Sequence, residues 1–171
     1  MHIRYVVLLA AAFAGCGEED PAPGELVVEW AGHEHGRFVA PLAATHCAAT
    51  GVVELIAIRG DTGLASALFL SDSTDLRTGD YPIFLAATAP EPRPGAVAAL
   101  RWFNLTSIVA YEGLSGIVHV EPGEALLSGR FDVKLQGIDQ PDTLRVTGRF
   151  DGVPLAQGDS TCSRTMRRNT L

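Results

Sequence analysis

The sequence lacks the motifs by which many enzymes and nucleotide-binding proteins are recognised. It contains no Gly-x-Ser-x-Gly nucleophile elbow, no phosphate-binding loop, no Gly-x-Gly-x-x-Gly after a strand and no Cys-x-x-Cys pair. Its longest uninterrupted apolar run is Tyr5 to Ala14. As a helix, this run would rise only about 15 Å, roughly half of a bilayer core, so it is too short to span a membrane. These absences leave no catalytic residue or cofactor to assign, and they favour a protein that is not an enzyme.

Composition narrows the class of protein further. The net charge of −7 disfavours nucleic acid and anionic membrane surfaces as partners. The sequence is rich in glycine (18) and proline (10), which disfavours long helices. Its 171 residues suffice for one domain with a real core, so we expect a single all-β domain.

The N-terminus has the layout of an export signal. His2 and Arg4 provide a short positive start, the apolar run Tyr5 to Ala14 follows, and Gly15 leads directly to Cys16. A positive region, a short apolar region and small residues before a cleavage point are the parts of a secretory signal peptide. We therefore expect residues 1–15 to be removed.

The residues before the cleavage point, Phe13-Ala14-Gly15-Cys16, resemble a bacterial lipobox. The family usually has leucine where this chain has Phe13, whereas Ala-Gly-Cys is intact. The resemblance implies that Cys16 becomes the lipidated first residue of the mature protein and holds it in a membrane. Lipoproteins of this kind carry two or three acyl chains, which is enough for stable attachment.

A short polar segment follows Cys16. Residues 16–24 are charged and rich in proline and glycine, which is typical of a flexible tether. In proteobacterial lipoproteins an aspartate directly after the cysteine signals retention in the inner membrane. Gly17 occupies that position here, which favours the outer membrane within the cell envelope.

Two cysteines remain after Cys16. In an exported protein the expected state of Cys47 and Cys162 is a disulfide. They lie 115 residues apart, so the bond would contribute about 4–5 kcal/mol in the chain-entropy model. It would join the start of the domain, residues 25–162, to its end, and residues 163–171 would form a loose tail. Reduced, reactive or metal-binding cysteines are the alternative.

Short apolar segments separated by turn residues predict a chain of strands. The clearest pair is Val52 to Ile58 and Leu64 to Leu70, which Gly60-Asp61-Thr62-Gly63 should join as a hairpin. Because both segments are almost continuously apolar, we expect both to be covered on both faces. The remaining predicted strands are Glu25 to Ala31, Gly36 to Ala40, Tyr81 to Ala86, Val97 to Ala110, Leu114 to Val120, Ala125 to Gln136 and Thr143 to Asp151. Pro82 should make its strand start late or lie at an edge, and Val97 to Ala110 should bend near Asn104.

The last two predicted strands alternate most regularly. Apolar residues on one face of each strand oppose charged residues on the other, which is typical of an antiparallel sheet with one face in water. We expect Arg130 opposite Asp151 and Phe131 opposite Phe150, because the neighbouring register sets Arg130 against Arg149 and like charges directly opposite destabilise a sheet.

Eight or nine strands with regular turns and no convincing helix predict an all-β protein. We favour an antiparallel β-sandwich, because two strands covered on both faces suit the middle of two packed layers. The alternative is a small closed or partly open β-barrel.

Three sets of residues are candidates for chemistry. His33 and His35 alternate on the chain, so together with His46 or His119 they could hold an ion such as zinc, although solvated polar residues are expected in that Gly-flanked turn anyway. Gly158-Asp159-Ser160 resembles the nucleophile motif of GDS-type lipases, but in that family the motif lies early in an α/β fold. Trp30, Trp102, Phe103 and Tyr111 could line a glycan groove, although core packing is the more ordinary role.

The sequence therefore favours a membrane-anchored envelope lipoprotein with a non-catalytic domain that binds or scaffolds an envelope protein or a glycan. A metal-binding protein or metal-dependent enzyme using His33 and His35 is one alternative, and convergence of the histidines would favour it. A ligand carrier of barrel type is another, and it requires a closed sheet with an apolar cavity.

Overall fold

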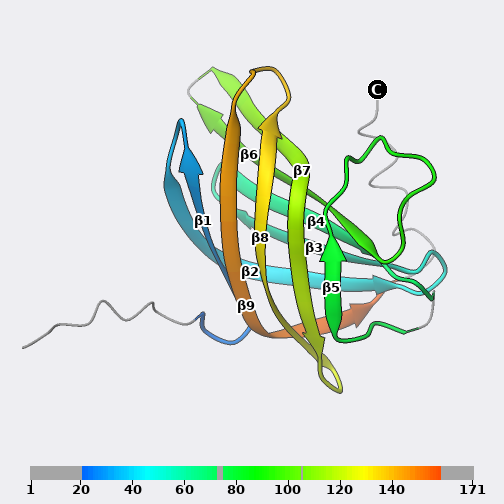
Figure 1. Cartoon of the computed structure of the whole chain (residues 1–171). Coiled ribbons are helices and arrows are strands. Elements are labelled where there is room, and N and C mark those ends of the chain that lie inside the picture. The colour runs from blue at the N-terminus through cyan, green and yellow to red at the C-terminus, as the bar shows by residue number, and fades with distance from the viewer. Residues whose placement is uncertain (1–20, 73–74, 105, 159–171) are drawn as a thin grey trace, which may run out of the picture.

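The computed structural model describes residues 21–72, 75–104 and 106–158, and over these ranges the chain is all strand and loop with no helix. The nine strands are β1 (Glu25–Gly32), β2 (Gly36–Cys47), β3 (Val52–Arg59), β4 (Thr62–Phe69), β5 (Gly79–Pro82), β6 (Gly95–Asn104), β7 (Ser107–Pro122), β8 (Leu126–Gly137) and β9 (Thr143–Gln157). The predicted all-β class is therefore confirmed. Their arrangement is shown in Figure 1.

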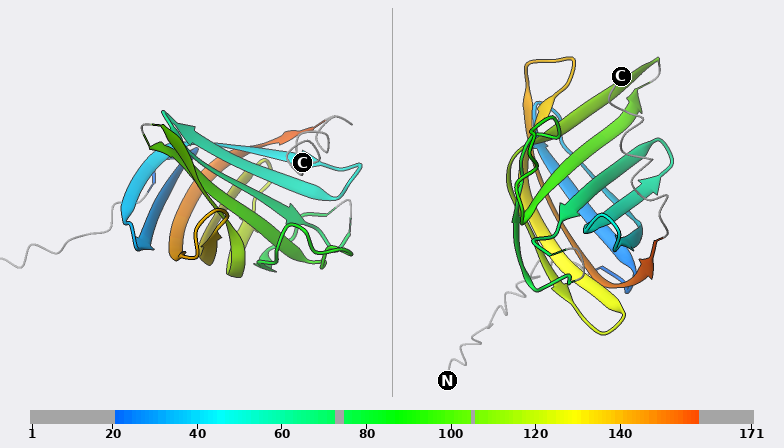
Figure 2. Two further views of the ribbon diagram at one scale, coloured as in Figure 1. Left: turned by 90° about the horizontal axis from the view of Figure 1, so that it is seen from above. Right: turned by 90° about the vertical axis from the view of Figure 1, so that its right-hand side faces the viewer.

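The strands form a closed barrel, so the preferred prediction of a β-sandwich is wrong and the barrel alternative is correct. Eight strands follow one another around the barrel in the order β1, β2, β3, β4, β6, β7, β8 and β9, and β9 returns to β1. Each of these neighbouring pairs is antiparallel. The ninth strand, β5, pairs with the second half of β7. It occupies the edge of β7 beyond the residues that pair with β6. Figure 2 shows the enclosed shape from two further directions.

Two long strands explain why the sheet closes. β7 has 16 residues and pairs with β6 near its start and with β8 over most of its length. β9 has 15 residues and pairs with β8 and β1, and its last residues run parallel to the end of β2. A strand that bends from one part of the wall to another removes the free edges that an open sandwich would leave.

Several strands were predicted correctly. β3 and β4 form the expected hairpin, with Gly60 at its turn in a left-handed conformation (φ +60°). β5 lies at an edge, as Pro82 predicted, but it covers Gly79–Pro82 instead of Tyr81 to Ala86. The alternation on β8 and β9 is confirmed, since Val133, Leu135, Leu144 and Val146 are all buried.

Two strand predictions are wrong. The segment Val97 to Ala110 does not bend as one strand but turns back on itself as the hairpin of β6 and β7. β3 is not covered on both faces, because Ile56 and Ile58 point outward and expose 37% and 59% of their surface. The barrel has one interior, so β3 buries only one face against it, whereas β4 also buries the outward residues Ala67 and Phe69 near its end.

The register of β8 and β9 also differs from the prediction. Arg130 lies opposite Arg149, the arrangement that charge repulsion disfavours, and Phe131 lies opposite Gly148 instead of Phe150. Phe150 correspondingly lies opposite Gly129, where an added Cβ would come within 2.7 Å of the phenylalanine ring. Each aromatic ring therefore lies over a glycine of the neighbouring strand, and this interior packing outweighs the repulsion between Arg130 and Arg149 on the outer face.

Candidate functional site

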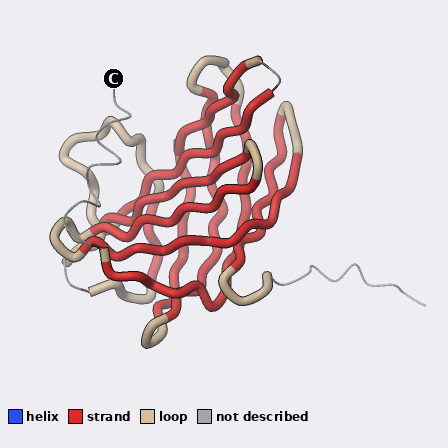
Figure 3. Tube along the Cα trace, turned by 180° about the vertical axis from the view of Figure 1, so that it is seen from behind, coloured by secondary structure: helices blue, strands red, loops and turns tan. Residues whose placement is uncertain are grey.

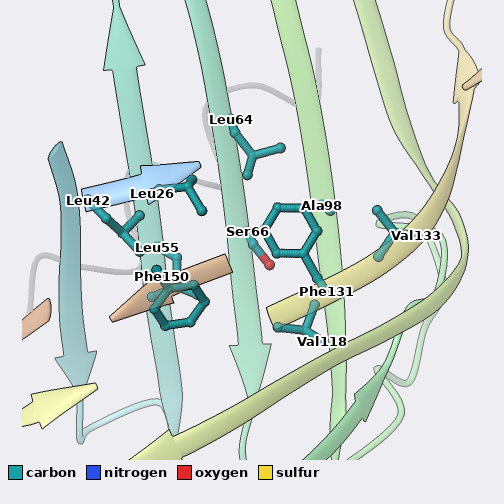
Figure 4. A pocket seen from close by; sticks show the side chains of 10 residues that line it. All are labelled: Leu26, Leu42, Leu55, Leu64, Ser66, Ala98, Val118, Phe131, Val133 and Phe150. Atoms are coloured by element: carbon teal, nitrogen blue, oxygen red, sulfur yellow. The ribbon is translucent and has the colours of Figure 1, made fainter. Parts of the chain in front are cut away.

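The barrel interior is apolar and filled. A small cavity of about 20 Å³ lies at its centre, and Figure 4 shows the side chains around it. They are Leu26, Leu42, Leu55, Leu64, Ser66, Ala98, Val118, Phe131, Val133 and Phe150. The hydroxyl of Ser66, the only polar group among these side chains, donates a hydrogen bond to the carbonyl oxygen of Val97 (2.8 Å). The cavity has room for about one water molecule, so this conformation offers no space for a carried ligand.

An aromatic stack lies inside one end of the barrel and consists of Trp30 on β1, Trp102 on β6 and Tyr111 on β7. The ring centres of Trp30 and Trp102 are 5.6 Å apart, and those of Trp102 and Tyr111 are 5.4 Å apart. The planes differ by only 21° and 20°, so both faces of the Trp102 ring are covered. Neither face of Trp102 is therefore open to a sugar ring, and the three rings pack on one another.

A polar contact fastens the loop between β8 and β9 to the aromatic stack. The hydroxyl of Tyr111 donates to Oδ2 of Asp142, and Nε2 of Gln140 donates to the same hydroxyl, both at 2.8 Å. Burial, the hydrogen bond with Asp142 and the charges of Asp142 and Glu34 together hold the pKa of Tyr111 well above its ordinary value. The phenol therefore stays protonated and keeps the loop over this end of the barrel.

The structure does not bring the candidate histidines together. His33 and His35 lie exposed in the turn before β2, whereas His46 is buried near the other end of that strand. At the usual rise per residue, the length of β2 separates His35 from His46 by up to roughly 35 Å. Over residues 21–72, 75–104 and 106–158, no group of three His, Cys, Asp or Glu side chains is placed to hold a metal ion.

A histidine that the sequence did not single out for a structural role holds the edge strand. Nδ1 of His119 on β7 lies 2.6 Å from Oδ1 of Asp80 on β5, and Nε2 lies 3.2 Å from Oε1 of Glu121. Both ring nitrogens are engaged by carboxylates, so the side chain links β5 to the barrel wall. The sequence marks His119 only as a possible metal ligand, and no local pattern identifies Asp80 as its partner.

Only part of the proposed cysteine pair can be placed. Cys47 is buried at the end of β2. The amide of Gly158 donates to the carbonyl oxygen of His46 (2.9 Å), so the chain passes beside Cys47 four residues before Cys162. Four residues are long enough for the chain to bring Cys162 to within disulfide distance of Cys47. Cys162 itself, the lipobox with Cys16, Asp159, Ser160 and the tail 163–171 lie outside the described residues, so these predictions stay predictions.

The outer surface has two contrasting sides. The outward side chains of β1, β8 and β9 form a charged face, on which Arg145 binds Asp132 (Nε to Oδ1, 2.9 Å) and Glu29 binds Arg37 of the neighbouring β2 (3.3 Å). The hydrogen bond from Arg145 lowers the pKa of Asp132 below its ordinary value. The outward side chains of β3 are instead apolar over Ile56 and Ile58. The two sides therefore differ in the kind of side chain that they expose, charged on one and apolar on the other.

Comparison of the chain with protein families, with curated proteins and with solved structures finds no match. In the part of the chain that the structure describes, no helix is long and apolar enough to cross a membrane.

Proposed function

We propose that the protein is a lipid-anchored lipoprotein of the bacterial cell envelope whose barrel is a non-catalytic binding or scaffolding domain. Ala14-Gly15-Cys16 supports the anchor, and Gly17 supports attachment to the outer membrane. In this proposal residues 16–24 tether the barrel and the Cys47–Cys162 disulfide stabilises it.

The filled interior is the observation that supports the binding role. A carrier needs a cavity of several hundred cubic ångströms, whereas the interior cavity here is about 20 Å³ and the aromatic stack blocks one end of the barrel. A partner is therefore met on the outer surface. Several charges of the charged face are already paired with one another. Contact with a partner would therefore remove most apolar surface from water on the side of Ile56 and Ile58.

Fractionation of cells that make Cys16→Ser tests the anchor. We expect this variant to leave the membrane fraction while its barrel stays folded, because the substitution removes only the acyl-bearing thiol. Cys47→Ser is the matched control, since it also removes one thiol and should stay in the membrane. A Cys16→Ser variant that remains in the membrane fraction would contradict the proposed anchor.

A further inference from the structure

One side of the barrel carries two adjacent rows of mostly apolar outward side chains. Figure 3 shows the molecule from behind, with neighbouring strands of the barrel wall running side by side across the view. The outward side chains of two adjacent rows on β2, β3, β4 and β6 define what we call the apolar face. They are Pro41, Ala43, Ile56, Ile58, Gly63, Ala65, Ala99 and Arg101.

The strand register arranges large and small residues of this face in a regular way. Ile58 lies beside Gly63 on β4, and Ile56 lies beside Ala65. β3 therefore carries a ridge of two isoleucines, and β4 carries a trough of two small residues next to it. Beyond the trough, Ala99 adds a further small side chain on β6. A ridge beside a trough of equal length can fit against a copy of itself.

We propose that the protein forms a homodimer through the apolar face, with a two-fold axis that runs parallel to the strands between β3 and β4. This axis seats Ile58 over Gly63 of the second copy and Ile56 over Ala65 of the second copy. Two sheets packed face to face lie about 10 Å apart, a spacing that a large side chain opposite a small one can fill. Closed two-fold pairs with self-complementary surfaces are the commonest form of homo-oligomer.

Charge favours this face over the rest of the surface as a contact between copies. The chain has a net charge of −7, so two copies repel one another at most approaches. The two rows of the apolar face contain no acidic residue and one charged residue, Arg101. The proposed axis places Arg101 over Pro41 of the second copy, so it brings no like charges together. Leu42 on β2 pairs with Ala57 on β3. Extending this antiparallel register by one residue places Pro41 beside Ile58.

The points where the chain enters and leaves the barrel are compatible with this contact. The chain enters at Glu25 on β1, which pairs with Pro41 at the margin of the face. It leaves at Gly158 beside His46, beyond the two rows on β2. Neither point lies over the ridge or the trough. This proposal names the partner for the outer-surface binding proposed above, and it holds whether or not the lipid anchor exists.

Sedimentation equilibrium of the full chain carrying Cys16→Ser, in the absence of detergent, tests the dimer separately from the anchor. We expect a concentration-dependent dimer, and we expect Ile58→Glu to raise its Kd at least about a hundredfold, because it buries an unpaired charge. Ile117→Glu is the matched control: Ile117 is an exposed isoleucine on β7, outside the apolar face (46% exposed), and its replacement should leave the Kd unchanged. Circular dichroism checks that each variant is folded.

An exchange of ridge and trough tests the axis itself. Ala65→Ile alone should raise the Kd about tenfold or more, because it meets Ile56 of the second copy. Ile56→Ala combined with Ala65→Ile should return the Kd to within a few fold of the parent, because the large and small residues have only exchanged places. A monomeric parent at all concentrations, or a double variant no better than Ala65→Ile, would overturn the proposal. In the first case another occupant would have to cover the face.

Discussion

Trp102 and Phe103 are neighbours on β6 whose side chains point to opposite sides of the barrel wall, so replacing each with alanine isolates the effect of the interior. Trp102 lies between Trp30 and Tyr111, with centre distances of 5.6 and 5.4 Å. Phe103 points outward and is 51% exposed. The two substitutions remove aromatic rings from adjacent positions, and only one of them removes a part of the aromatic stack.

We expect Trp102→Ala to lower the free energy of unfolding by about 3 kcal/mol. Removing a large aromatic residue from a core costs about 3–5 kcal/mol. Trp102 is only half-buried, which favours the lower end of that range, although it also loses two stacking contacts worth about 0.5–1.5 kcal/mol each. Phe103→Ala should cost about 0.5 kcal/mol or less, as is usual for a surface residue.

Urea unfolding followed by far-UV circular dichroism measures both values, since neither depends on the remaining tryptophan as a probe. Near-UV circular dichroism should in addition lose intensity in Trp102→Ala, because Trp30 no longer has a stacked neighbour. Equal losses of stability in the two variants, or a loss below about 1 kcal/mol for Trp102→Ala, would refute the packing role of the aromatic stack.

Two further predictions concern the Tyr111 phenol and the cysteine pair. The pKa of Tyr111 is raised in the folded protein, so its contribution to stability is complete below the unfolded value near pH 10 and is lost as pH rises towards the folded value. The free energy of unfolding of the parent, measured between pH 8 and 11, should therefore fall more steeply than that of Tyr111→Phe, and parallel curves would contradict this role. Cys47→Ser and Cys162→Ser should each lower the free energy of unfolding of the oxidised protein by up to about 4–5 kcal/mol, and the double variant should lose no more than either. If reductant leaves the unfolding of the parent unchanged, the disulfide is contradicted.

The elements that were predictable from the sequence are those governed by residues close together in the chain. The turn at Gly60 and Asp61 and the alternation around Val133 and Val146 depend on local patterns, and both are present. The hairpin of β6 and β7 was missed because its strands are joined by a short turn that no glycine or proline marks. Local patterns therefore determined most strands but not all of their ends.

What could not be predicted depends on distant partners. The choice between sandwich and barrel rests on β9 reaching from β8 to β1, a pairing between opposite ends of the sequence. The register of β8 and β9 rests on the fit of Phe131 over Gly148, which outweighs the repulsion between Arg130 and Arg149. The aromatic stack draws one residue from each of three strands. The sequence singled out Trp30, Trp102 and Tyr111, but only the closed barrel places them together.

The pairing of β1 with β9 has a consequence for how the protein folds. Leu26 has Phe150 as its partner, so the first strand finds one of its two neighbours only after nearly the whole domain is available. A fold rich in such distant pairings has a high contact order and folds slowly. A chain emerging from its N-terminus would hold β1 with one edge open until β9 arrives, and an open edge invites pairing with other chains. The pairing of β9 with β1 is thus the folding step that closes the barrel, and failure of this step leaves the chain open to aggregation.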